Sequence, residues 1–119
     1  MLLNQDDIID SNGFEFVIQT LTENAPRVKW ESARVIGNTA CLFPKLLKKA
    51  SIPLLYNTGN ASTVVRWSAA YALSEIILCK TRLNKELIPA FESNVKREKQ
   101  NNIRKIYLQA LTKISHQWI

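Results

Sequence analysis

A pattern of ten residues occurs three times in this chain of 119 residues. Its copies begin at Val28, Val65 and Ile103, so the offsets are 37 residues (28 to 65) and 38 residues (65 to 103). Each copy starts with an aliphatic residue and a cation and continues with mostly small or aliphatic residues. A period of roughly 20 to 50 residues is typical of a solenoid, in which each unit buries its apolar face by stacking on its neighbours. The repeat therefore predicts an architecture before it says anything about function.

A second segment of each unit also recurs. Pro53, inside an apolar stretch, returns as Pro89 36 residues later, and residues 13–21 are a plausible first copy without the proline. Each unit therefore reads as a first helix, a short polar turn and a second helix. We predict an all-α fold, an α-α superhelix of three helix-turn-helix repeats with about six helices. The expected organisation is a polar acidic segment at 1–12, one repeat domain at 13–115 with units at about 13–43, 44–81 and 84–115, and a tail at 116–119.

Local signals place the ends of these helices. Ser11 or Asn12 is expected to cap a first helix that begins near Gly13, because short polar side chains accept hydrogen bonds from free amides there. Pro26 and Pro44 suit the first turns of later helices. Pro53 and Pro89 lie inside helical patterns and predict kinks.

Composition excludes several classes of protein. Hydrophobic residues make up 46% and charged residues 22%, which is ordinary for a globular chain. No apolar run approaches the ~18 residues that a bilayer-spanning helix needs. The N-terminus is acidic and lacks the basic start of a secretory signal, which favours the cytoplasm. Cys41 and Cys79 lack the spacing of a metal site, so we expect free thiols and neither a metal nor a cofactor.

Charge is unevenly distributed along the chain. Residues 1–26 hold five acids and no Lys or Arg, whereas residues 27–119 hold all sixteen Lys and Arg against five acids, a difference of +11. Such asymmetry indicates an anionic partner for the basic part, a solvated surface, or compensation by a neighbouring domain. Two basic clusters, Lys45–Lys49 and Lys96–Lys99, are expected to be solvated helix faces.

The segment from Val65 to Leu73 resembles the second-helix signature of HEAT repeats, an aliphatic residue and an arginine followed by small residues that end in Ala-Leu. Pro53 and Pro89 match the kink that this family carries in its first helix. The resemblance covers about residues 13–115 and is strongest in the second unit. It implies a scaffold that holds a protein or nucleic-acid partner on a concave surface lined by the second helices.

One departure from the family concerns the contacts between repeats. HEAT proteins often carry an aspartate in the turn that pairs with the second-helix arginine of a neighbouring unit. Here the turns offer asparagines, such as Asn60, which can bond a cation but without the charge-assisted part. We expect the repeats to be stabilised by Lys29, Arg66, Arg104 and Asn60.

The second helices also predict a binding surface. If the small and aliphatic residues of 63–80 point inward, then Trp67, Tyr71 and Glu75 lie on the opposite side. Stacking would align them with the equivalent positions of the other units. We call the resulting set the aromatic-basic stripe and define it as Trp30, Arg34, Trp67, Tyr71, Lys105, Gln109 and Lys113.

Aromatic residues and arginine dominate the binding hot spots of protein interfaces. They also stack on bases and neutralise phosphates. The alternative is that Trp30 and Trp67 pack between adjacent units as core, because large aromatics usually bury most of their area.

These observations favour a non-catalytic HEAT-repeat module that binds a protein partner through its concave face, with no membrane or small-molecule partner. The alternative is a nucleic-acid-binding protein. A less favoured one is a base-excising enzyme, because a branch of HEAT-like proteins uses tryptophans, arginines and one aspartate in the concavity. Here the aspartates, Asp6, Asp7 and Asp10, all precede the first repeat, and the only histidine, His116, lies in the tail.

Overall fold

The computed structural model describes residues 9–117 and contains six α-helices and no strand within that range. The helices are α1 (Ser11–Thr20), α2 (Pro26–Thr39), α3 (Leu47–Asn57), α4 (Thr63–Ile77), α5 (Asn84–Arg97) and α6 (Asn101–Gln117). Two short 3-10 turns, η1 (Ala40–Leu42) and η2 (Pro44–Leu46), join α2 to α3. The prediction of an all-α chain with about six helices is confirmed.

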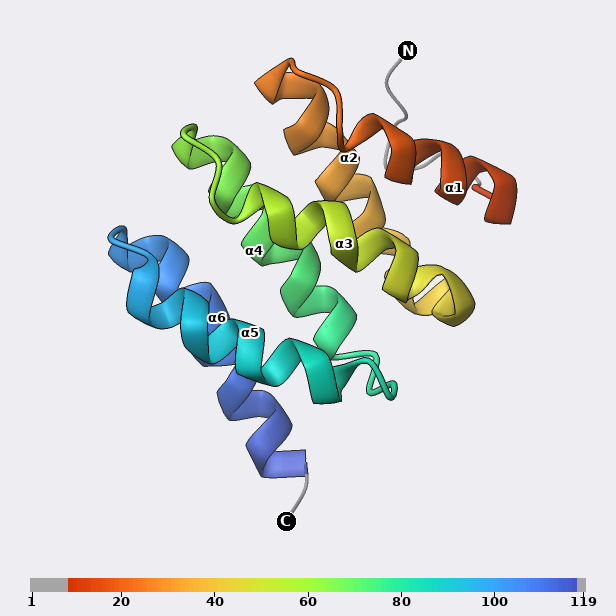
Figure 1. Ribbon diagram of the computed structural model, residues 1–119. Helices are drawn as coiled ribbons and strands as arrows, with labels where there is room; N and C mark the ends of the chain where they lie inside the picture. The colour runs from red at the N-terminus through yellow and green to blue at the C-terminus, as the bar shows by residue number, and fades with distance from the viewer. Residues whose placement is uncertain (1–8, 118–119) are drawn as a thin grey trace.

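The helices lie in two layers (Figure 1). One layer holds α1, α3 and α5, and the other holds α2, α4 and α6. Each odd-numbered helix packs on the helix that follows it, and α4 packs on both α2 and α6. The contact between α2 and α4 is the most extensive in the molecule. The second helices therefore form a continuous packed row.

The core follows from the composition of α4, which has neighbours on several sides. Val65, Ala69, Ala72 and Ile76, the residues expected to point inward, are buried. Buried side chains also cover other sides of α4, including Ala70 and Leu73. A helix that is apolar on most of its circumference is stable only when neighbouring helices enclose it.

Two helix boundaries differ from the prediction. Asp10, rather than Ser11 or Asn12, caps α1, and its Oδ1 accepts a hydrogen bond from the amide of Gly13 at 2.8 Å. Helix α1 therefore begins at Ser11, inside the polar acidic segment that we predicted at 1–12. At the other end, α6 continues to Gln117. It therefore passes through residue 115, where we predicted that the repeat domain ends and the tail begins.

The prediction of free thiols is wrong. Cys41 in η1 and Cys79 just after α4 form a disulfide, with their Cα atoms 5.4 Å apart. The two cysteines follow the ends of α2 and α4, and their separation of 38 residues is close to the repeat offset. Because α2 and α4 pack side by side, equivalent positions meet. The spacing thus held a signal that we did not read.

Gly37 lies where α2 and α4 approach each other closely. A Cβ atom at this position would lie 2.6 Å from Cε2 of Tyr71 and 3.2 Å from the Cα of Ala72. No side chain fits there without movement of the tyrosine ring or of the α4 backbone.

We expect Gly37→Ala to lower the free energy of unfolding by about 1 to 2 kcal/mol, because forcing a carbon atom into a packed contact costs that much. Helix propensity alone would favour alanine by about 1 kcal/mol, so a net loss reports the close contact. Urea denaturation measures the effect. Gly59→Ala is the matched control, because a Cβ there meets no atom closer than 3.8 Å. Equal or improved stability of Gly37→Ala would contradict the prediction.

Candidate functional site

The exposed side of α4 carries a stacked aromatic pair. Trp67 and Tyr71 are one helical turn apart, with ring centroids separated by 5.9 Å and ring planes inclined by 5°. Trp67 is 39% exposed and Tyr71 is partly buried. The pair therefore presents an accessible aromatic surface that is held in one orientation by the helix.

A second tryptophan and a cation lie on α2. The guanidinium carbon of Arg34 is 5.4 Å from the ring centroid of Trp30, within the range of a cation–π contact. Both side chains are partly buried. The Nε atom of Arg34 is buried and has no hydrogen-bond partner among the described residues. Neither tryptophan of the stripe is a fully buried core residue.

Tyr71 connects these two groups. Its hydroxyl donates a hydrogen bond to Oδ1 of Asn38 on α2, and its ring covers Gly37. Burial raises the pKa of the Tyr71 hydroxyl, and the nearby Glu75 carboxylate raises it further, while Arg34 opposes both. The hydroxyl therefore stays protonated at neutral pH and acts as a hydrogen-bond donor to Asn38.

The part of the stripe on α6 is different in character. Lys105, Gln109 and Lys113 are exposed, and no hydrogen bond or ion pair joins their side chains to another described residue. The aromatic-basic stripe thus consists of a linked aromatic and cationic part on α2 and α4 and a separate polar part on α6.

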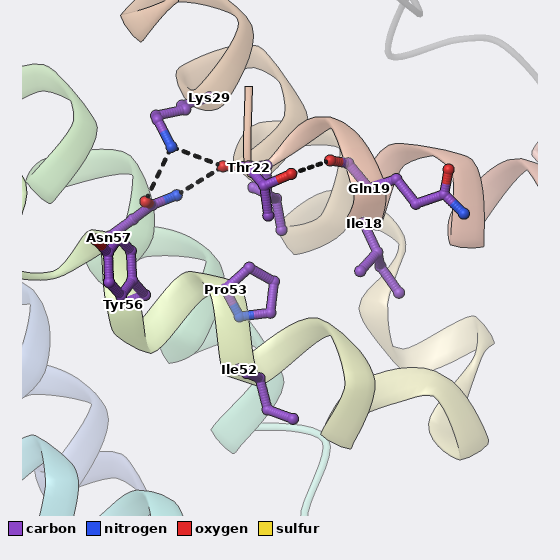
Figure 2. Close-up of a pocket in the computed structure, with 9 residues that line it drawn as sticks. Ile18, Gln19, Thr22, Lys29, Ile52, Pro53, Tyr56 and Asn57 are labelled. Carbon is purple, nitrogen blue, oxygen red and sulfur yellow. Dashed lines mark hydrogen bonds between the residues drawn. The ribbon is translucent and has the colours of Figure 1, made fainter. Parts of the chain in front are cut away.

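The predicted repeat-stabilising cations, Lys29, Arg66 and Arg104, lie near the N-terminal ends of α2, α4 and α6, and each directly precedes a residue of the stripe. Nζ of Lys29 donates to the carbonyl of Leu21 at 3.0 Å and to Oδ1 of Asn57 at 3.3 Å, while Nδ2 of Asn57 donates to the same carbonyl at 3.2 Å. Figure 2 shows this buried triangle. It joins the first helix pair to the end of α3. Asn57 was not singled out from the sequence.

Arg66 makes the corresponding link from α4. Its Nε donates to Glu98 at 3.0 Å, and its Nη1 donates to the main-chain carbonyls of Asn60 and Ala61 at 3.0 and 3.2 Å. The Asn60 side chain does not reach the guanidinium, because its Oδ1 accepts from the amide of Ser62. Glu98, which we expected on a solvated face, is only 6% exposed. The turns lack the aspartate that would pair with Arg66, and Glu98 at the end of α5 provides the carboxylate instead.

Another surface feature is a groove of about 560 Å³ between α1 and α3 (Figure 2). Ile18, Pro53 and the exposed Ile52 and Tyr56 give it apolar walls. Of its polar members, Lys29, Asn57 and Thr22 already bond within the protein, which leaves the side chain of Gln19. The groove therefore offers apolar surface with little directional polar recognition.

Catalytic groups are sparse in the part of the chain that the structure describes. Glu31 pairs with Arg27 at 3.2 Å, and Asp10 caps a helix. Asp6 and Asp7 lie outside the described residues, as does the side chain of His116. No group of three or more His, Cys, Asp or Glu gathers there as metal ligands would. No described helix is long and apolar enough to cross a membrane.

Comparisons with known proteins leave the family open. No family model, no curated protein and no solved structure matches this chain.

Proposed function

We propose that the chain is a HEAT-like solenoid module of three stacked helix pairs, which binds a protein segment on the exposed face of its second helices. The solenoid is supported by the order of the helices in two layers and by equivalent cations, Lys29 and Arg66, that each link one helix pair to the next. The fold by itself does not select a partner.

The observation that carries the binding proposal is the stacked pair of Trp67 and Tyr71. A partly exposed aromatic surface that is fixed by stacking and by the contact with Asn38 loses little side-chain entropy when a partner covers it. The flanking Arg34 adds a residue type that is enriched with aromatics in binding hot spots. A protein segment with apolar side chains for the indole and acceptors for the guanidinium fits this arrangement.

We expect Trp67→Ala to weaken partner binding by about 30-fold, the effect of losing a hot-spot residue, with the fold intact. Quantitative affinity capture measures which proteins the wild type retains and the variant loses. Tyr56→Ala is the matched control, since Tyr56 is an exposed aromatic in the other layer. Equal capture by wild type and Trp67→Ala, or equal losses in both variants, would refute the proposal.

Nucleic-acid binding is the second candidate, because stacked aromatic rings beside Arg34, Lys105 and Lys113 suit bases and phosphates. Fluorescence anisotropy of labelled single-stranded and duplex DNA and RNA at about 50 and 200 mM salt distinguishes the two candidates. Binding that collapses at the higher salt would favour nucleic acid, and no binding at the lower salt would leave the protein partner.

A base-excising enzyme has the least support, because it would need a carboxylate acting within the stripe. The stripe as defined contains no carboxylate, and Glu75, whose charge raises the pKa of Tyr71, is a carboxylate beside it. The cytoplasmic location also stays a prediction. The disulfide weighs against it, because disulfides persist mainly in oxidising compartments.

A further inference from the structure

Arg104 lacks the contact that its counterparts make. Lys29 and Arg66 occupy equivalent positions of the repeat, and each donates to an oxygen from the next helix pair. The Nε atom of Arg104 is buried and has no hydrogen-bond partner among the described residues. The guanidinium of Arg104 therefore lacks an acceptor like the Glu98 carboxylate that pairs with Arg66.

Apolar residues on the same side of α6 are exposed, although the residues at the equivalent positions of α4 are buried. Ala70 and Leu73 are fully buried in α4, which packs on α6. Their equivalents 38 residues later are Leu108, which is 45% exposed, and Leu111, which is partly buried. This side of α6 therefore presents apolar surface that no described helix covers completely.

The first helix pair carries the matching groups. Glu98, which pairs with Arg66, precedes Ile103 by five residues, and Glu23 precedes Val28 by the same five. Glu23 is exposed in the turn after α1, and its side chain forms no hydrogen bond or ion pair with a described residue. Glu23 therefore occupies the position equivalent to Glu98, but no described arginine pairs with its side chain.

The first helix pair, which carries Glu23, also has exposed apolar surface. Phe16 on α1 is 54% exposed, and its equivalent 37 residues later, Pro53, lines the groove that faces α1. Phe16 thus lies where a preceding helix pair would cover it.

The charges of the two ends are opposite. Within residues 9–26 there are three acids, Asp10, Glu15 and Glu23, and no Lys or Arg. Residues 96–113 carry six cations and one acid, Lys96, Arg97, Lys99, Arg104, Lys105, Lys113 and Glu98. Opposite potentials steer two surfaces together and fix which end meets which.

We propose that the occupant of the α6 face is a second copy of this chain, stacked head to tail so that Arg104 of one copy pairs with Glu23 of the next. Leu108 and Leu111 then pack against the first helix pair of that copy, near Phe16. A stacked pair keeps one free end of each kind, so the contact is heterologous and propagates into short chains or a closed ring.

Sedimentation velocity of the intact protein between about 1 and 300 μM tests this contact, since that range covers micromolar self-association. The average mass of the wild type rises with concentration, and the rise is smaller at about 200 mM than at 50 mM salt, because exposed charges are screened more strongly at the higher salt. Glu23→Arg and Arg104→Glu each place like charges in the contact, so each weakens association by about tenfold or more.

The charge-swapped variant, Glu23→Arg with Arg104→Glu, restores association, as does an equimolar mixture of the two single variants. Lys85→Glu makes the same change of net charge as Arg104→Glu, but at an exposed position on α5, and associates like the wild type. Circular dichroism of every variant shows that the fold is kept. Trp67→Ala also associates like the wild type, which separates this contact from the binding proposed for the stripe.

A wild-type mass that stays at one copy across the whole concentration range overturns the proposal and leaves the α6 face to an occupant of another kind. Failure of the charge-swapped variant to associate better than the single variants also overturns it, because the contact would then not be between residues 23 and 104.

Discussion

Replacing Cys41 and Cys79 together by serine lowers the free energy of unfolding by about 4 kcal/mol. The disulfide closes a loop of 38 residues, and the chain entropy that such a loop removes from the unfolded state corresponds to about 4 kcal/mol. Urea denaturation of the wild type and the double variant measures the difference, provided that both transitions are two-state with similar slopes.

Two controls separate the crosslink from the substitutions. The reduced wild type should unfold at the same urea concentration as the double serine variant, because both lack the covalent constraint. Wild-type protein denatured without a reductant should show no reactive thiol. Detection of two thiols, or identical unfolding curves with and without reductant, would contradict the crosslink between Cys41 and Cys79.

Glu98→Gln lowers the free energy of unfolding by about 3 kcal/mol at neutral pH, because it removes the charge that compensates the partly buried guanidinium of Arg66. The Glu98 side chain is 6% exposed and that of Arg66 19%, so water replaces little of the lost interaction. Chemical denaturation at pH 7 measures this loss. Glu92→Gln is the matched control, since Glu92 is an exposed glutamate on the same helix and has no described partner.

The same carboxylate makes stability depend on pH. Burial alone would raise the pKa of Glu98, but hydrogen bonds from the Gln100 amide and from Arg66 outweigh burial and hold the pKa below its usual range. A carboxyl group whose pKa is depressed in the folded state contributes stability above its unfolded pKa of about 4.3, and this contribution is lost as the pH falls through the folded value.

We therefore expect the difference between wild type and Glu98→Gln to shrink as the pH falls below about 4, the region in which an unperturbed glutamate titrates. The variant Arg66→Met with Glu98→Gln should lose less than the sum of the two single losses, because the residues interact directly. A constant difference between pH 3 and pH 7, about four decades of proton concentration around that titration, would show that the charge of Glu98 does not support the fold.

Local patterns predicted the helices well, and they predicted contacts between repeats less well. The spacing of Val65, Ala69, Ala72 and Ile76 marks one face of a helix, and periodicity of 3.6 residues is a local property that the sequence displays directly. The same spacing put Trp67 and Tyr71 together on the other side, where they stack. Asp10 was missed as a cap because several short polar residues in succession compete for that role.

The sequence alone determined the all-α class, the number of helices and the side of α4 that enters the core, because apolar periodicity and proline positions act within single segments. Only the tertiary structure decided the partners of Cys41, Arg66 and Lys29. Their long-range partners, Cys79, Glu98 and Asn57, lie 28 to 38 residues away, and the positions of these partners depend on how one helix pair is rotated and shifted against the next. That arrangement is set by packing across the interface, as at Gly37, and no single segment contains it.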